Sequence, residues 1–264
     1  MKLKWLLTAG FEIDTDNYKI FIDPFISRPK NAVPQLKKIT IDDIKKGNVI
    51  FLSHGHFDHA FDLPQIVEDS DIKIYCSEPV SKMLTNKFNI SKRNVQAVKG
   101  GDLLKFEPDF SVNIIKSKHI RYNTSLILKK IFNGDILNLK KSAGMGIIEV
   151  FKWRAGQVLG YLFEFKEGKK ILHFGSGGYI KDEIAKLPKD IDYFLAPVAG
   201  RSDSDKYLAK LTGLITPKTV IPHHFDDFFP HLSWMAYGNF NEELKKVNPN
   251  INILKLEPEL EIEI

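Results

Sequence analysis

Short apolar runs alternate with amphipathic segments along almost the whole chain. The runs at 48–53 and 158–165 are rich in β-branched and aromatic residues, which is typical of buried strands. Segment 78–88 instead places Val80 and Leu84 four positions apart, which indicates an amphipathic helix. We predict strands over 1–23 (two or three of them), 48–53, 72–76, 95–98, 103–106, 110–118, 158–165, 170–174, 191–197, 219–222 and 251–256, and helices over 40–46, 62–69, 78–88, 180–186, 205–215 and 233–247. This alternation predicts an α/β fold built in layers.

Length and composition describe one ordinary globular domain. The chain has 264 residues, of which 43% are hydrophobic and 27% charged. No run approaches the roughly 20 apolar residues of a membrane span, and the first residues lack the apolar core of a secretory signal. Cys76 is the single cysteine, so no intrachain disulfide can form, which suits a reducing cytoplasm. We therefore expect a cytoplasmic protein with one domain over 1–264.

The net charge changes this picture only slightly. A formal charge of +5 and a pI near 9.0 favour anionic small molecules or surfaces as partners. No dense stripe of Lys and Arg marks a path for nucleic acid, so we expect no nucleic-acid partner.

Candidate chemistry gathers where the predicted strand at 48–53 ends. His54, His56, Asp58 and His59 follow within six positions, and glycine separates the first two. Imidazole nitrogens and carboxylate oxygens are ligands that Zn²⁺, Mn²⁺ and Fe²⁺ accept. A lone histidine is usually a surface or core residue, but three histidines with an aspartate at H-x-H-x-D-H spacing indicate a metal site.

This spacing resembles the signature of the metallo-β-lactamase superfamily, and the likeness extends over nearly the whole chain. Upstream, residues 5–13 and 19–25 resemble the opening hairpin of that fold. Downstream, strand-like runs end in His119, in Gly175-Ser176 and in His223-His224. The pattern is most similar to the branch of ascorbate-6-phosphate-lactonase-like proteins, which includes lipid phosphodiesterases. The resemblance implies a four-layer αβ/βα sandwich over 1–264.

The resemblance also implies where metal ions would bind. Site 1 would use His54, His56 and His119, and site 2, if filled, would use Asp58, His59 and His224. One or two Zn²⁺ or Mn²⁺ ions are expected, and Fe²⁺ less so. Such a metal activates a water for hydrolysis, and Asp58 would orient this water or accept its proton. Asp23, after the third predicted strand, would support the metal loop, although a simple turn explains an aspartate before proline equally well.

One position departs from the family pattern. Ser176 stands where the family carries an aspartate that bridges two metals, and a neutral hydroxyl is a poor bridge. We therefore expect one metal, or a weakly held second one, unless Asp226 or Asp227 reaches in from the later loop. The glycines around Ser176 could offer backbone N–H groups to an anion, although a plain tight turn explains them as well.

Four further positions are weaker candidates. Neighbouring strand residues point to opposite faces, so only one of His223 and His224 can face the metals, and the family pattern selects His224. Arg201 ends a predicted strand and could meet an anionic substrate, whereas one of residues 202–203 can cap the following helix. His231 lies in a loop and could contribute to substrate handling.

Residues 120–156 form an insertion, because lactonase-like relatives pass this point in a shorter loop. The segment is too apolar for simple disorder, and long insertions in compact domains are often functional. Three interpretations stay open: a lid over the metal site, a contact in a homo-oligomer, and a basic amphipathic patch for a membrane surface. A lid would bring Ile131, Phe132, Phe151 and Trp153 near the metals and imply a substrate with an apolar portion.

The expected activity is hydrolysis of an ester bond, in a lactone or a phosphodiester, of a small anionic substrate. β-Lactamase activity is disfavoured because no secretory signal is present, and nuclease activity because the chain lacks the extra domain of RNA-processing relatives. Ser176 leaves open a metal-binding scaffold without turnover. A single metal on three protein ligands leaves open an iron sulfur-dioxygenase, whereas a di-iron flavoprotein would need a flavin domain that is not evident.

Overall fold

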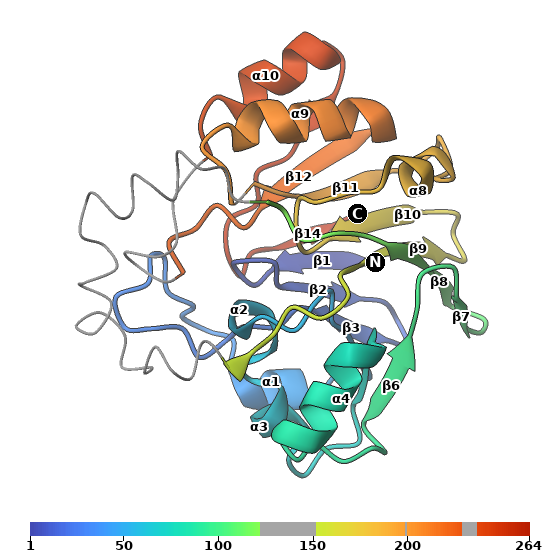
Figure 1. Ribbon diagram of the computed structural model, residues 1–264. Helices are drawn as coiled ribbons and strands as arrows, with labels where there is room; N and C mark the ends of the chain where they lie inside the picture. The colour runs from blue at the N-terminus through green and yellow to red at the C-terminus, as the bar shows by residue number, and fades with distance from the viewer. Residues whose placement is uncertain (122–151, 199, 229–236) are drawn as a thin grey trace.

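Two seven-stranded sheets face each other in the computed structural model, which describes residues 1–121, 152–198, 200–228 and 237–264 (Figure 1). The first sheet contains, in spatial order, β14 (Glu261–Glu263), β1 (Lys2–Trp5), β2 (Phe11–Asp14), β3 (Lys19–Ile22), β4 (Val49–Phe51), β5 (Lys73–Ser77) and β6 (Val95–Val98). The second contains β13 (Asn252–Ile253), β12 (Thr219–His223), β11 (Tyr193–Pro197), β10 (Lys170–Phe174), β9 (Leu159–Phe165), β8 (Phe110–Lys116) and β7 (Leu103–Phe106).

Helices cover the outer face of each sheet, which gives four layers (Figure 1). The first sheet is covered by α1 (Ile41–Lys45), α2 (Phe57–Ala60), α3 (Leu63–Val67) and α4 (Glu78–Lys87). The second is covered by α8 (Lys181–Ala185), α9 (Ser204–Ile215) and α10 (Phe240–Val247). The four-layer αβ/βα arrangement predicted from the sequence is therefore confirmed.

Three clusters of buried side chains fill the spaces between the four layers. The cluster between the two sheets includes Phe51 and Tyr161. A second cluster, which includes Ile50, lies between the first sheet and its helices, and a third, which includes Phe194 and Phe240, lies between the second sheet and its helices. Because each sheet is covered on both faces, its central strands are apolar throughout rather than alternating.

Strand β4 shows how this burial pattern determines the sequence. Val49 and Phe51 belong to the cluster between the sheets, whereas Ile50 and Leu52 belong to the cluster beneath the helices. Successive side chains of a strand point to opposite faces, so both faces of β4 must be apolar. The strand ends one residue before Leu52, and the polar motif residues follow in the loop.

The loops that carry candidate site residues lie at one edge of the sandwich. Strands β3, β4, β5 and β6 run parallel, as do β10, β11 and β12. Strand β8 shares the direction of β10 because β9 is antiparallel to both. The carboxyl ends of parallel strands open onto the same edge, and this edge is where ligands usually bind in α/β sheets.

Most predicted elements are confirmed over the described residues, some with shorter bounds. The helix predicted at 40–46 is α1, whose Thr40 and Asp43 form a reciprocal capping box. The strand predicted at 251–256 is reduced to β13, and of the helix predicted at 233–247 the structure describes α10. Segment 122–151, the body of the predicted insertion, lies outside the described residues. The lid, the oligomer contact and the membrane patch therefore stay predictions.

Two elements, α2 and β14, do not appear among the predicted ones. Helix α2 is a single short turn inside the metal motif, where polar ligands replace the helical apolar pattern. In β14, Ile262 packs against the cluster between the sheets while Glu261 forms an ion pair with Lys2 at 2.7 Å. The alternation of Glu261, Ile262 and Glu263 is thus that of a strand with one face buried and the other exposed to solvent. Among the described helices, none is long and apolar enough to span a membrane.

Candidate metal centre

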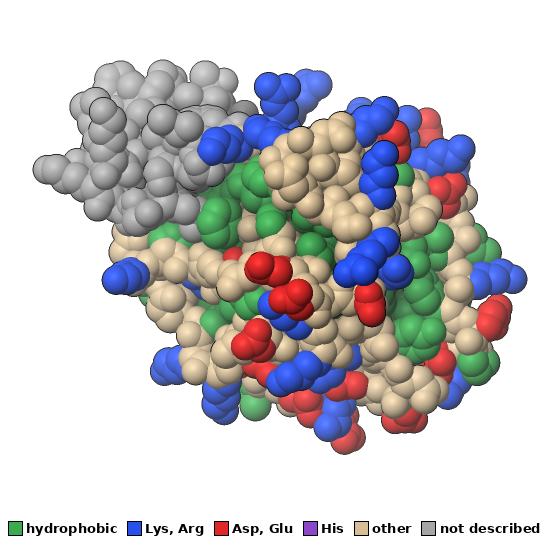
Figure 2. Space-filling view, turned by 90° about the horizontal axis from the view of Figure 1, so that it is seen from below, with side chains coloured by type: hydrophobic (Ala, Val, Ile, Leu, Met, Phe, Trp, Pro, Cys, Tyr) green, Lys and Arg blue, Asp and Glu red, His purple; other side chains and the backbone are tan. Residues whose placement is uncertain are grey.

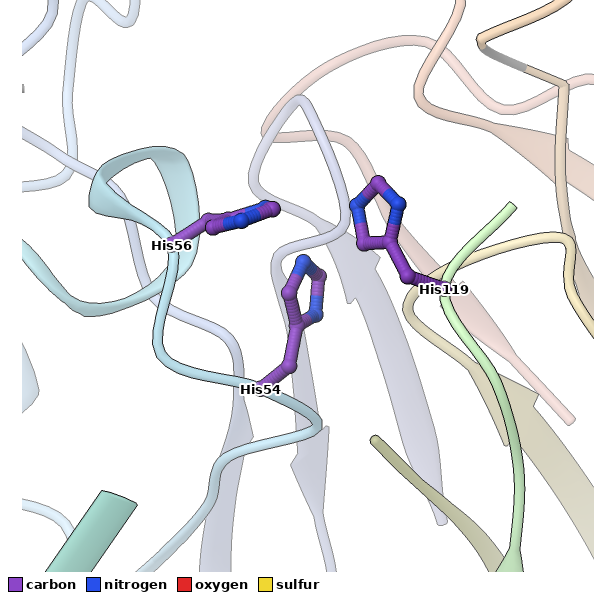
Figure 3. A group of neighbouring side chains, drawn as sticks. All are labelled: His54, His56 and His119. Carbon is purple, nitrogen blue, oxygen red and sulfur yellow. The ribbon is translucent and has the colours of Figure 1, made fainter. Parts of the chain in front are cut away.

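Three histidine side chains from two loops point at a common centre (Figure 3). His54 and His56 lie in the loop between β4 and α2, and His119 follows β8. Their ring centroids are 4.8, 5.2 and 4.7 Å apart, and one ring nitrogen of each lies within 4.8 Å of the others. We call these residues the three-histidine cluster. Its spacing allows three nitrogens to reach one cation.

Asp58, His59 and His224 form a second group, the Asp58 cluster, whose ligand atoms also lie within 4.8 Å of one another. Asp58 Oδ2 is 3.5 Å from His59 Nε2 and 3.3 Å from His224 Nε2. The clusters are adjacent, because the ring centroids of His54 and His59 are 4.0 Å apart. The structure gathers the six residues into the two predicted groups, and their role as ligands stays a prediction.

Burial gives the three-histidine cluster its chemistry. It lowers the pKa of His54 and His119 and lowers that of His56 to about 4. These imidazoles are therefore neutral near pH 7 and keep the lone pairs that a metal ligand needs. In the Asp58 cluster, burial alone would raise the pKa of Asp58, but the facing His59 and His224 hold it below its ordinary value. That carboxylate is therefore ionised.

Asp23 lies behind both clusters. Its carboxylate accepts hydrogen bonds from Ser53 N at 2.6 Å, from Ser53 Oγ, and from His59 Nδ1 at 2.8 Å. Ser53 Oγ in turn accepts from His54 Nδ1 at 3.0 Å. Both histidines thus carry the proton on Nδ1 and keep Nε2 free for a cation. Gly175 completes this contact, since a Cβ there would collide with Ser53 and Asp23.

Ser53 is absent from the sequence-predicted candidates, although its place directly before His54 is a signal that could have found it. A hydroxyl both donates and accepts, so it can link a carboxylate to an imidazole. The position of Asp23 is the one that its predicted supporting role requires.

Ser176 contacts the segment that carries His119. Its hydroxyl, which is buried, accepts a hydrogen bond from Ile120 N at 2.9 Å. The N–H group belongs to the residue after His119, so Ser176 fixes the backbone beside a candidate ligand. Among the described residues, Asp58 is the one carboxylate in the two candidate groups, and neither group includes a carboxylate from the loop after β12.

Asp226 does not reach the metal clusters, which corrects one of the alternatives predicted from the sequence. Its carboxylate forms an ion pair with Arg28 at 2.7 Å and accepts hydrogen bonds from Thr8 N and Thr8 Oγ1. The backbone of Asp227 bridges to Val33, and its side chain belongs to neither cluster.

His223 and His224 diverge as the strand geometry predicts. His223 points into the space between the sheets, where its ring stacks on His173 at 5.2 Å and meets Phe11 edge-on. It therefore belongs to the core. Burial lowers the pKa of His223 well below its ordinary value, so this ring is neutral as well.

Arg201 is held by its own neighbours. Its guanidinium forms two hydrogen bonds to Asp203, at 2.7 and 2.9 Å, and lies over the ring of Tyr207. Asp203 occupies the N-cap position of α9, as one of the two predicted alternatives has it. Its side chain makes no hydrogen bond to the first backbone N–H groups of the helix, so the expected capping bond is absent at this residue. The carboxylate is engaged by Arg201 instead. His231 lies outside the described residues.

The end of the predicted insertion is anchored on the metal loop. Gly55, between two candidate ligands, donates its N–H to Ala155 O at 2.9 Å. Trp153 stacks on Phe88 with ring centroids 3.7 Å apart and is buried. Trp153 is thus part of the core beneath the helices of the first sheet rather than a wall of the metal centre.

Comparison with known proteins agrees with this geometry. A family model described as a beta-lactamase superfamily domain matches residues 18–227, most of the chain. The chain belongs to the beta-lactamase superfamily. Among its relatives, a protein of Methanobrevibacter smithii named UPF0173 metal-dependent hydrolase is 26% identical over 264 residues, which cover 98% of this chain and 95% of the relative. A protein of Pyrococcus abyssi with the same family name is 26% identical and is matched over the full length of both chains.

Solved structures that resemble this chain support the fold. Igni18, a metallo hydrolase of Ignicoccus hospitalis, superposes with a TM-score of 0.68 at 21% identity and covers 100% of this chain and 98% of its own. An isothiocyanate hydrolase from Delia radicum gut bacteria superposes with a TM-score of 0.64 at 16% identity, covering 100% and 99%. The metallo-β-lactamase fold is thereby confirmed, whereas the lactonase-like branch stays a prediction.

Proposed function

We propose that this protein is a metal-dependent hydrolase that cleaves an ester bond, in a lactone or a phosphodiester, of a small anionic substrate. The observation that carries the proposal is the convergence of His54, His56 and His119 on one point, beside the ionised Asp58. Relatives in the superfamily are named metal-dependent hydrolases, which supports the same reaction class.

The donor set fits a divalent cation such as Zn²⁺ or Mn²⁺. The Nδ1 atoms of His54 and His59 are engaged by Ser53 and Asp23, which leaves Nε2 of each ring for either ion, and the Asp58 carboxylate adds an oxygen donor. His224 turns Nε2 toward Asp58, at 3.3 Å from Asp58 Oδ2, so this nitrogen lies among the donor atoms of the Asp58 cluster. A bound cation would polarise the scissile carbonyl or phosphoryl oxygen and activate a water.

The protein's own residues would perform the remaining steps. Asp58, at hydrogen-bond range from His224 Nε2, can accept the proton of the attacking water because its carboxylate is ionised. Asp23 keeps His59 oriented, and through Ser53 it orients His54. Asp58 is therefore the proposed catalytic residue, and Asp23 and Ser53 are positioning residues.

The face of the molecule seen in Figure 2 argues against a polyanionic substrate. On the face seen in Figure 2, basic side chains alternate with acidic ones and form no continuous basic patch. Arg201, bound to Asp203, would have to share its guanidinium with a substrate anion. The preference for an anion therefore rests on the net charge of +5.

The test combines metal content with a panel of chromogenic substrates: a carboxylic ester, a lactone and a phosphodiester. We expect Zn²⁺ or Mn²⁺ in the purified protein, hydrolysis of at least one substrate, and loss of both metal and hydrolysis in His119→Ala. Asp109→Asn, which changes a buried carboxylate at the opposite end of β8, serves as the control. A chain that takes up no metal even with Zn²⁺ or Mn²⁺ added would overturn the proposal and leave a scaffold. An iron protein that oxidises a persulfide but hydrolyses nothing would favour a sulfur-dioxygenase.

A further inference from the structure

Thr8 holds the turn that carries His224 by hydrogen bonds, although the two residues lie more than two hundred positions apart in the chain. We call the contacts of Thr8, Arg28 and Asp226 around this turn the clasp. His224 N donates to Thr8 O at 2.8 Å. Thr8 N donates to Asp226 Oδ1 at 3.0 Å, and Thr8 Oγ1 donates to Asp226 Oδ2 at 3.1 Å. Three hydrogen bonds thus connect the β1–β2 turn to both ends of the segment from His224 to Asp226.

Arg28 closes this clasp with a buried positive charge. Its Nη2 lies 2.7 Å from Asp226 Oδ2, and its Nη1 donates to Thr8 Oγ1 at 2.9 Å. The side chains of Arg28 and Asp226 are 1% and 0% exposed. Asp62, three residues after His59, accepts from the N–H groups of Ile26 and Ser27, which precede Arg28. The network therefore connects the segment that follows α2 with the turn of His224.

The clasp coincides with strained backbone. Thr8 has a φ of 47° and His224 a φ of 60°, both in the left-handed region that residues other than glycine rarely adopt. A β-branched residue such as Thr8 is especially disfavoured there. Such conformations persist only where surrounding contacts over-determine them, and they concentrate at functional sites. Here the surrounding contacts are the hydrogen bonds and the ion pair of Thr8, Arg28 and Asp226.

We propose that Arg28, Asp226 and Thr8 are positioning residues that hold His224 in its left-handed conformation and thereby determine how tightly the Asp58 cluster binds a divalent cation. The inference rests on the proposed function only in assuming that the two clusters bind metal. His54, His56 and His119 lie on the loops after β4 and β8 rather than on the turn that Thr8, Arg28 and Asp226 hold, so we expect the three-histidine cluster to keep its affinity when these contacts are removed.

The experiment titrates metal-free protein with Zn²⁺ against a chromogenic chelator, so it needs no turnover. The wild type is expected to bind one equivalent tightly and a second one more weakly, as Ser176 in place of a bridging aspartate implies. Thr8→Val removes the hydroxyl at nearly constant shape, and Asp226→Asn removes the charge. Because Asp226→Asn leaves Arg28 buried without a counter-charge, the double variant Arg28→Met with Asp226→Leu is measured too, since removing both charges restores stability.

We expect each variant to weaken the second equivalent roughly 10- to 100-fold and to leave the first unchanged. Asp109→Asn is the matched control, because Asp109 is also buried and paired, with Asn17 at 2.7 Å and Lys166 at 3.6 Å, yet lies away from the metals. The control should match the wild type at both equivalents.

Three results would overturn the inference. In the first, the double variant keeps a wild-type melting temperature and a wild-type affinity for the second equivalent. In the second, both equivalents weaken together, which indicates a general effect on folding, and in the third, the wild type binds only one equivalent. A protein that binds two equivalents as expected but hydrolyses none of the test substrates would instead refute the proposed function and leave the positioning role intact.

Discussion

The three-histidine cluster and the Asp58 cluster, the two candidate metal sites, contain similar side chains but differ in charge. The three-histidine cluster consists of imidazoles that burial keeps neutral, on the loops after β4 and β8. The Asp58 cluster carries a buried negative charge and depends on His224, whose backbone is strained. The comparison teaches that the first cluster offers neutral nitrogen donors, whereas the second includes an ionised carboxylate that can accept a proton.

The largest expected effect separates these two roles. Asp58→Asn keeps the shape of the side chain but removes its charge and its ability to accept a proton. We expect the rate of hydrolysis to fall about 10²- to 10⁴-fold, which is the usual contribution of a positioned general base. Because the three histidines are untouched, the purified variant should retain metal. Elemental analysis together with initial rates on the preferred substrate checks both statements.

His56→Ala provides the opposite case, since it removes a ligand and leaves Asp58 in place. It should lose metal and activity together. If Asp58→Asn lost metal to the same extent as His56→Ala, Asp58 would be chiefly a ligand, and the proposed division between the clusters would be wrong.

An intermediate effect is expected where the two clusters share one support. Asp23→Asn weakens the acceptor for His59 and for Ser53, so both clusters should bind Zn²⁺ about 10- to 100-fold more weakly. Ser53→Ala removes the hydroxyl that links Asp23 to His54 but leaves the hydrogen bond between Asp23 and His59, so it should weaken the three-histidine cluster more than the Asp58 cluster. Chelator competition on each variant measures the two affinities.

Equal weakening of both clusters by Ser53→Ala would contradict this arrangement. Thr85→Ala, which removes a half-buried hydroxyl bonded within α4, is a suitable control for the loss of a hydroxyl.

The smallest expected effect tests whether burial alone suffices to keep a histidine neutral. His173 lies outside both clusters, donates Nε2–H to Ala9 O at 3.1 Å, and has a pKa lowered to about 4 by burial. The unfolded chain binds this proton near the ordinary value of 6.5, so the unfolded state holds more protons between these two values. Stability of the metal-free protein should therefore fall as pH falls from about 6.5 to about 4.

His173→Gln should reduce that slope by about one proton per molecule, as measured by urea unfolding over a pH series. An unchanged slope would mean that the titration belongs to other histidines whose pKa burial lowers, such as His223 and those of the three-histidine cluster. Denaturation at constant pH 7 serves as the reference for the cost of the substitution itself.

The sequence predicts the layers and the ligands far better than the supports. β4 is a continuous apolar run and β9 is one except for Glu164, because both of their faces are largely buried, and that signal is local. The H-x-H-x-D-H motif is equally local. Arg28 and Thr8 carry no such signal, because their function depends on Asp226, which folding brings to them from about two hundred positions away.

Arg201 and Asp226 show that the sequence also proposes contacts that the folded structure does not make. Each is a charged residue at a loop beside the metal edge, and the sequence makes each a candidate for direct contact. The structure pairs Arg201 with Asp203 and Asp226 with Arg28, so their charges are already matched by protein partners. Which partner a charge meets depends on tertiary packing rather than on its position in the chain.

The separation of the three buried clusters has a consequence for how such a protein can evolve. The sheets divide the interior into compartments, and no buried residue belongs to more than one of them. Effects of substitutions in separate compartments should therefore add with little epistasis. During evolution, a substitution that weakens the packing beneath α9 could be compensated by one that improves the packing beneath α4. The loops that carry the histidines could change independently, under selection for chemistry. Stability and chemistry would then be inherited as nearly independent traits.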